Sequence, residues 1–205
     1  PPAWASGELR GLIVLGIVMY GLTQGAQFVA IAHQPAATTS LVLSLTPLLV
    51  GLIGRRALGE HASPGQLAGT LLVVAGATVY FAGGLGSTAV GLTAALVGLA
   101  ANVAASLLGR HVNRAAGRPA IVVTAVSMSV GAAALLAVGL AVEGVPRPTP
   151  RTVAIVAWLA VVNTALAFTL WNFALRRLTA VASAGINNLM LIQIAALAWV
   201  FLGEP

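Results

Sequence analysis

Long apolar stretches separated by short polar connectors run through the whole chain. A helix needs about 20 apolar residues to cross a hydrocarbon core about 30 Å thick, because each residue advances it by about 1.5 Å. Uncharged stretches of this length lie near 11–32, 36–54, 65–86, 88–109, 119–142, 152–175 and 179–202. Strands of membrane barrels are only about ten residues long, so these stretches predict helices. The expected fold class is all-α, a polytopic membrane helical bundle of about seven transmembrane helices.

Two connectors carry a local signal for the start of a helix. Ser63 and Gln66 have the spacing of a capping box, with Pro64 at the first helical position. Thr149 and Pro150 give a similar start to the sixth stretch. The third and sixth helices are therefore expected to begin at these two prolines.

The arginines between the stretches predict which way the helices run. Cytoplasmic loops carry an excess of arginine and lysine. If each stretch crosses the membrane once, one side holds only Arg147 and Arg151. The other side holds Arg10, Arg55, Arg56, Arg110, Arg114, Arg118, Arg176 and Arg177. The start of the first helix is therefore expected in the cytoplasm.

An internal repeat relates the first two helices to the last two. An ungapped shift of 144 residues places 21–60 on 165–204, with identities at 30/174, 36/180, 45/189 and in the ending Leu-Gly-Glu. Charged residues are rare here, so two such endings at matching positions favour a true repeat. An odd number of helices separates the two starts, so the second copy is inverted across the bilayer. Glu60 is then expected to be cytoplasmic and Glu204 external.

An apolar helix with Pro47, the ending Leu58-Gly59-Glu60 and a following glycine-rich helix resemble the EamA repeat of the drug/metabolite transporter superfamily. The resemblance covers essentially the whole chain. It implies part of a ten-helix inverted-repeat transporter fold, in which the first two helices and the last are absent. Residues 1–86 would then hold the last three helices of the first repeat, and 87–205 the first four of the second. The second copy departs from the pattern, since Leu191 stands where Pro47 would.

Composition agrees with a membrane protein. Apolar residues make up 59% of the 205, charged residues 7%, and the mean hydropathy is +1.00. Soluble domains are about 45 to 50% apolar and about 25% charged. The net charge of +6 comes from arginines scattered between apolar stretches, without a basic face, so nucleic acid is not an expected partner.

Several chemistries lack the residues that they need. The chain has no lysine for a retinal Schiff base, no aspartate pair for an intramembrane protease and no cysteine. No His-Glu-x-x-His and no Gly-x-Ser-x-Gly sequence is present. We therefore expect no enzyme, no catalytic residue, no cofactor and no metal site.

Polar side chains within the predicted helices define a candidate binding site. Such side chains are costly in lipid and usually face the bundle interior or a water-filled cavity. On helical wheels they form stripes on the first, second, fourth, sixth and seventh helices, which correspond to the helices that line the cavity in the EamA family. The candidate residues are Tyr20, Gln24, Gln27, Ser40, Ser44, Pro47, Asn102, Ser106, Phe168, Trp171, Asn172, Asn187 and Asn188.

The same residues also fit structural roles in packing and capping. Serine, threonine and asparagine also bond neighbouring helices together, and Pro47 can serve as a simple packing kink. Asn163 lies opposite Asn172 on its helix and is expected to serve packing. Glu60 and Glu204 are candidates for gating or coupling, although a carboxylate at a helix end can also cap it or pair with arginine. Gly65, Gly69 and Gly76 permit close packing within the bundle or in a homodimer.

These observations favour a multi-pass protein that moves a small metabolite or an amphipathic solute, in export or import, by alternating access between the inverted repeats. Its partners would be the solute and the lipid bilayer. A bacterial plasma (inner) membrane is expected, since the basic residues are all arginine and the resemblance points there. The alternatives are a seven-helix receptor or sensor and a structural membrane subunit. No motif identifies the solute, the driving ion or the oligomeric state.

Overall fold

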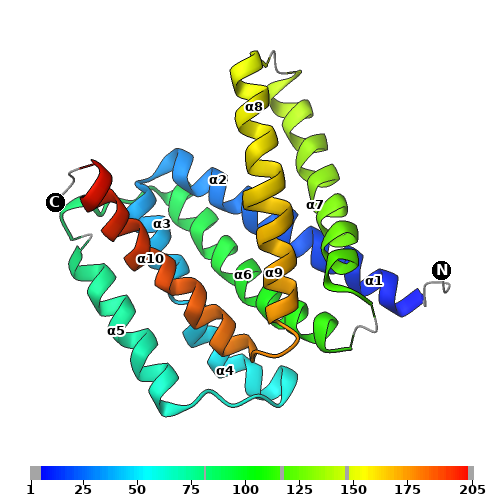
Figure 1. Ribbon diagram of the computed structural model, residues 1–205. Helices are drawn as coiled ribbons and strands as arrows, with labels where there is room; N and C mark the ends of the chain where they lie inside the picture. The colour runs from blue at the N-terminus through cyan, green and yellow to red at the C-terminus, as the bar shows by residue number, and fades with distance from the viewer. Residues whose placement is uncertain (1–5, 81, 116–117, 146–147, 203–205) are drawn as a thin grey trace.

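The computed structural model describes residues 6–80, 82–115, 118–145 and 148–202 (Figure 1). All regular elements within these ranges are helices, which confirms the all-α fold class. The helices are α1 (Ser6–Leu15), α2 (Thr23–His33), α3 (Ala36–Leu43), α4 (Thr46–Leu58), α5 (Pro64–Tyr80), α6 (Ala89–Ala115), α7 (Ala120–Glu143), α8 (Pro150–Trp158), α9 (Ala167–Ala174) and α10 (Ala180–Leu202). The shorter segments are the π-helices η1 (Gly16–Leu22) and η3 (Leu159–Leu166) and the 3-10 turn η2 (Ala82–Gly84).

Five helical stretches among the described residues are long and apolar enough to cross a membrane. They are Gly7–His33, Ala36–Leu58, Ala89–Arg114, Ala120–Glu143 and Pro150–Ala174, and each matches a predicted span. The last predicted span corresponds to α10, which is 23 residues long. The predicted count of seven is thus confirmed in part.

The third predicted span is shorter than the apolar pattern indicated. Helix α5 has 17 residues and ends at Tyr80, whereas the apolar stretch continues to residue 86. Gly83, Gly84 and Gly86 follow, and glycine costs a helix about 1 kcal/mol per residue relative to alanine. The loss of helix propensity therefore ends α5 before the apolar composition does.

The two predicted helix starts are confirmed. The Ser63 amide donates to Gln66 Oε1 (2.9 Å), and the Gln66 amide donates to Ser63 Oγ (3.2 Å). Thr149 Oγ1 accepts from the Thr152 amide at the start of α8. At the other end of a helix, Gly59 terminates α4 in the left-handed region with φ of 68°, a conformation that glycine adopts without steric cost.

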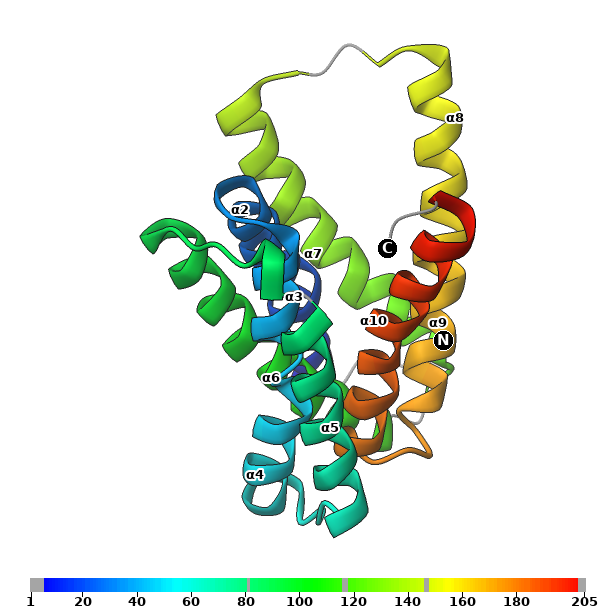
Figure 2. The ribbon, with the colours of Figure 1, turned by 90° about the vertical axis from the view of Figure 1, so that its left-hand side faces the viewer.

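The helices lie in two groups that diverge at one end. Figure 2 shows α8, α9 and α10 on one side and α2, α6 and α7 on the other, with α7 and α8 splayed apart toward their connector. At the opposite end, the corner between α9 and α10 packs close to α4 and α6. This end carries the connectors that the arginine pattern places in the cytoplasm.

A close helix crossing lies where η1 meets α7. A Cβ atom built on Gly16 would overlap the Ser127 carbonyl, and one on Gly131 would overlap the Tyr20 side chain and the Gly16 carbonyl. Without side chains at these two positions the backbones approach each other directly. A separate apolar core joins α4, α6 and α10 through Val50, Val103 and Val181.

The element boundaries repeat at the shift of 144 residues. Adding 144 to 36, where α3 begins, gives 180, where α10 begins, and α10 continues to Leu202, the last residue that the structure describes. Adding it to η1, 16–22, gives 160–166, and η3 spans Leu159–Leu166. The same shift relates α1 to α8. The second copy differs in having one unbroken helix where the first has a break between α3 and α4.

Candidate functional site

Pro47 breaks the first copy's second span near its middle. Proline has no N–H, so the Leu43 carbonyl, four residues earlier, loses its helical donor. The Thr46 hydroxyl donates to this carbonyl at 2.6 Å. The Ser44 hydroxyl donates likewise to the Leu41 carbonyl at 2.7 Å. Buried hydroxyls thus satisfy the carbonyls freed by the break, as hydrocarbon surroundings require.

One carbonyl at the break is satisfied from another helix. The Ser44 carbonyl accepts a hydrogen bond from Asn188 Nδ2 of α10 at 2.7 Å, and both residues are buried. From α6, Asn102 Nδ2 donates to Thr46 Oγ1 at 3.4 Å. The structure therefore brings Ser44, Pro47, Asn102 and Asn188 together around a helix break, and each was a candidate from sequence.

A second polar cluster surrounds Asn172 of α9, which is fully buried. Its Nδ2 atom donates to Thr124 Oγ1 (3.0 Å) and lies 3.5 Å from the Tyr20 hydroxyl, while its Oδ1 accepts from Asn113 Nδ2 (2.7 Å). The Tyr20 and Phe168 rings meet edge to face, with centroids 4.9 Å apart. Tyr20, Phe168 and Asn172 thus form one cluster, which bonds α6, α7, α9 and η1 to one another.

The remaining candidates are less tightly held. Gln24, Gln27, Ser40 and Trp171 are half-buried, and Asn187 is exposed. The side chains of the two glutamines and Trp171 have no hydrogen-bond partner among the residues that the structure describes.

One candidate makes a bond within its own helix. The Ser106 hydroxyl donates to the Asn102 carbonyl at 2.9 Å, one turn earlier in α6. This bond occupies the hydroxyl proton, while the oxygen retains acceptor capacity.

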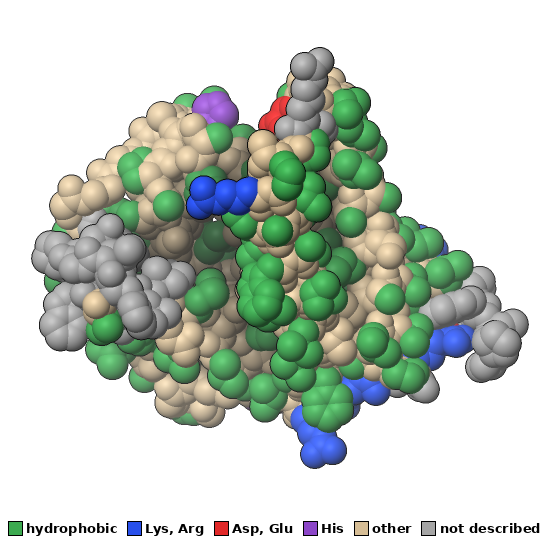
Figure 3. All heavy atoms as spheres, turned by 45° about the horizontal axis from the view of Figure 1, so that its top comes forward, with side chains coloured by type: hydrophobic (Ala, Val, Ile, Leu, Met, Phe, Trp, Pro, Cys, Tyr) green, Lys and Arg blue, Asp and Glu red, His purple; other side chains and the backbone are tan. Residues whose placement is uncertain are grey.

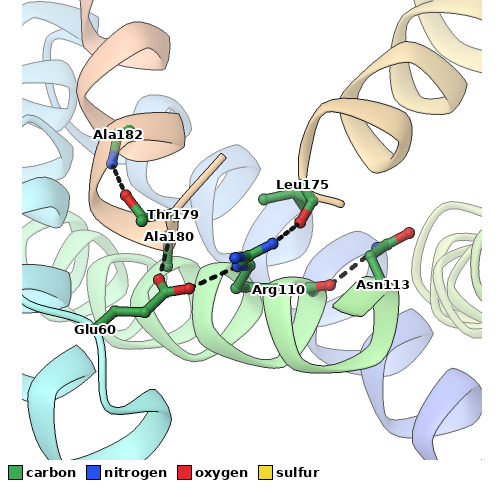
Figure 4. Close-up of polar contacts among 8 residues, drawn as sticks. Glu60, Arg110, Asn113, Leu175, Thr179, Ala180 and Ala182 are labelled. Atoms are coloured by element: carbon green, nitrogen blue, oxygen red, sulfur yellow. Dashed lines mark hydrogen bonds and ion pairs between the residues drawn. The ribbon is translucent and has the colours of Figure 1, made fainter. Parts of the chain in front are cut away.

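Glu60 lies at the predicted cytoplasmic end, where four helices meet (Figure 4). Its Oε1 atom is 2.7 Å from Arg110 Nε, and its Oε2 atom accepts from the Ala180 amide at 2.9 Å. Arg110 also donates through Nη1 to the Leu175 carbonyl at 2.7 Å. The two charged side chains are 8% and 11% exposed, so the pair is buried. Glu204, its predicted counterpart, lies outside the described residues.

The opposite face of the molecule is hollowed. Figure 3 shows a recess beside the column formed by α8 and α9, at the end where α7 and α8 diverge. A separate open groove of about 860 Å³ lies between η1, α2, α6 and α7. Its lining is apolar apart from Thr93 and includes none of the candidate residues. Its chemistry suits hydrocarbon rather than a polar solute.

Sequence reasoning missed three residues that organise these clusters. The sequence pattern uses Arg110 only as a marker of orientation and does not distinguish Asn113 or Thr46. Asn113 lies near the end of α6, where its polarity is unremarkable in sequence, yet it is 2% exposed. A signal for Thr46 was available, because a hydroxyl directly before a mid-helix proline can donate to the freed carbonyl.

The described residues contain no group of three or more His, Cys, Asp or Glu side chains that could hold a metal ion. The assembled groups are amides, hydroxyls and aromatic rings, with one buried ion pair at the end of the bundle.

The chain is similar to a known protein family and to a solved structure. A model of the EamA-like transporter family matches residues 1–82 and 90–205. One solved structure, described only as a crystal structure of a protein, is similar with a TM-score of 0.70 and 25% sequence identity. The match covers 95% of this chain and 71% of that one. No curated protein matches the chain.

Proposed function

The chain belongs to the EamA-like transporter family of multi-pass membrane proteins, and from this premise we propose that it moves a small metabolite or amphipathic solute by alternating access between two inverted repeats. The solute would cross without covalent change. The single observation that carries the proposal is the bond between the Ser44 carbonyl and Asn188, because these two residues are equivalent under the repeat. Equivalent residues can touch only where they lie next to the axis that relates the two copies.

The proposed binding site lies at this axis. Broken helices near the bilayer midplane present free backbone groups to solutes in many inverted-repeat transporters. Ser44 lies eight residues from the start of its span, and Asn188 lies eight residues from the start of the oppositely directed α10. At about 1.5 Å per residue both are about 12 Å inside the bundle, near its middle. The whole candidate set from Tyr20 to Asn188 would line the site.

The character of the lining favours an amphipathic solute. Gln24 and Gln27 offer amides from the first copy, whereas the equivalent positions in the second copy are Phe168 and Trp171. Amides can bond a polar end of the solute while the rings stack on an apolar end. The recess between the diverging helix groups would be the entrance from the external side.

We also propose that residues 1–86 and 87–205 are parts of two repeats of a larger bundle. Helix α8 makes no substantial contact with any described element except η3, which continues it, whereas its equivalent α1 packs against α6 and α7. Asn163 is exposed in the middle of this span, where an unpaired amide is costly in lipid. Two further helices, equivalent to α6 and α7, would cover this face. The family match likewise divides between residues 82 and 90.

Alternating access can be tested by cysteine labelling, because residues 1–205 contain no cysteine. We would place Ser40→Cys in the full-length protein, with any cysteine outside these residues replaced. A membrane-impermeant sulfonated maleimide is then applied from either side of sealed vesicles, with and without aromatic amino acids or other amphipathic metabolites. Labelling from both sides, with protection by a transported solute, is expected.

Leu72→Cys on the exposed side of α5 serves as the matched control, since its side chain is 74% exposed among the described residues. A reagent that stays in water should label this lipid-facing position from neither side, with or without solute. If Ser40→Cys is labelled from neither side, or if no solute ever alters its labelling, the transport proposal fails and the receptor and structural alternatives return.

A further inference from the structure

Arg110 joins the cytoplasmic ends of four helices through two different kinds of contact. Its Nε atom pairs with Glu60, which follows α4, and its Nη1 atom donates to the Leu175 carbonyl at the end of α9. Glu60 in turn accepts from the Ala180 amide, the first residue of α10. In Figure 4, Arg110 lies between Glu60 and Leu175. The corner between α9 and α10 is therefore fastened at both of its ends.

The two helices joined at this corner carry five of the thirteen proposed binding residues. Helix α9 holds Phe168, Trp171 and Asn172, and α10 holds Asn187 and Asn188. A rigid movement of the corner away from α4 and α6 would open a path from the cytoplasm to these side chains. The same movement would have to break the bond from Arg110 to the Leu175 carbonyl and the bond from the Ala180 amide to Glu60.

Because the Arg110–Glu60 pair is buried, its bonds to the corner favour two positions of the corner, one closed and one open. We call the bonds of Arg110 to Leu175 and of Glu60 to Ala180 the latch. Moving the corner leaves the Arg110–Glu60 pair intact but breaks the bond of each side chain to the corner backbone, and a buried charge is compensated only while its hydrogen bonds are satisfied. The corner is thus held firmly while both side chains are in place. Once it has moved, water can solvate both charges at the open end, so the intermediate positions are the costly ones.

We propose that Arg110 is the positioning residue that closes the cytoplasmic gate, through Glu60 and the backbone of the α9–α10 corner. The inference rests on the proposed transport function and deepens it by naming what holds this state shut. The chain offers a matched comparison. Glu8 and Arg118 form another ion pair at the same end, 2.6 Å apart, but their side chains are 28% and 17% exposed.

The test uses two single-cysteine reporters in the full-length protein. Ser183→Cys lies one turn into α10 from the latch and is 2% exposed, so it reports opening toward the cytoplasm. Ser40→Cys reports access from the external side. Each is combined with Arg110→Gln, Glu60→Gln or the control Glu8→Gln, and labelled with a sulfonated maleimide in vesicles of known orientation.

Arg110→Gln and Glu60→Gln are each expected to raise cytoplasmic labelling of Ser183→Cys by about tenfold or more, since removing one partner leaves the other charge buried. External labelling of Ser40→Cys should fall at the same time. Glu8→Gln should change neither rate by more than about twofold. Elution as a single species in detergent establishes that each variant has folded.

A rise at both reporters together means that the variants merely loosen the bundle, and this overturns the proposal. No rise at Ser183→Cys also overturns it, while the proposed transport stands if solutes still protect Ser40→Cys. The exchanged pair Glu60→Arg/Arg110→Glu gives a further check. It should not restore closure, because the Leu175 carbonyl needs a donor and the Ala180 amide needs an acceptor. Restored closure would show that the ion pair acts without the corner.

Discussion

The Ser44 carbonyl accepts a 2.7 Å hydrogen bond from the Asn188 side chain, and the two residues stand 144 positions apart, the shift that relates the two copies of the repeat. In the first copy the Leu48 amide, four residues on, bonds to the Leu45 carbonyl, so the Ser44 carbonyl has no helical donor. In the second copy the helix is continuous, and the side-chain amide of Asn188 donates the hydrogen bond. The two copies have therefore diverged into complementary halves of one contact.

We expect Asn188→Ala to lower the free energy of unfolding by about 1–3 kcal/mol, because it leaves the buried Ser44 carbonyl without a donor. The thermal midpoint of the detergent-solubilised protein measures the effect. Asn187→Ala is the matched control, since its side chain is exposed and no described residue bonds to it. Equal losses in the two variants would contradict a specific role for the bond.

The crossing between η1 and α7 should not tolerate a side chain. Gly131→Ala is expected to destabilise the protein by about 1–3 kcal/mol, because the new methyl group would overlap the Tyr20 side chain and the Gly16 carbonyl. Gly76→Ala, in α5, has open space around the added atom and should be neutral or slightly stabilising. Thermal unfolding in detergent distinguishes the two, and a neutral Gly131→Ala would mean that the crossing is looser than described.

Asn172 should be the most sensitive member of its cluster. Asn172→Ala removes the acceptor of Asn113 and a donor to Thr124, both of which are buried. A loss of about 2 kcal/mol or more is expected from such groups left without partners. Thr169→Val, one turn away, removes only an exposed bond to the Ala165 carbonyl of η3. The yield of folded protein and its thermal midpoint are the measurements, and a loss as large for Thr169→Val would argue against the network.

The outer face of α8 and η3 should be covered in the full-length protein. Ala160 is equivalent to Gly16, which α7 covers, whereas Ala157 is equivalent to Ile13, which is exposed. We therefore expect Ala160→Leu to destabilise the full-length protein by about 1–3 kcal/mol through overpacking, and Ala157→Leu to be neutral. The thermal midpoints of the two variants in detergent measure the difference. Neutral behaviour of both would mean that lipid covers this face, and the proposed larger bundle would lose its support there.

Sequence alone predicted the features that depend on neighbours along the chain. The spans follow from the length of apolar stretches, and the starts of α5 and α8 follow from Ser63 and Thr149. The family and the repeat followed from Pro47 and the Leu-Gly-Glu endings. Local pattern failed at the end of α5, where glycine outweighed apolar composition.

Partners across the bundle could not be predicted in the same way. The helical period shows which face of α9 carries Asn172, but it does not show that this face meets Tyr20 and Asn113. The sequence predicts Arg110 only as a marker of the cytoplasmic side, and it does not show that this side chain is buried against Glu60, fifty positions away. A polar group inside the bundle takes whichever partner the helix crossings bring within about 3 Å. Those crossings depend on which side chains are small enough for backbones to approach, and only the tertiary structure decides that.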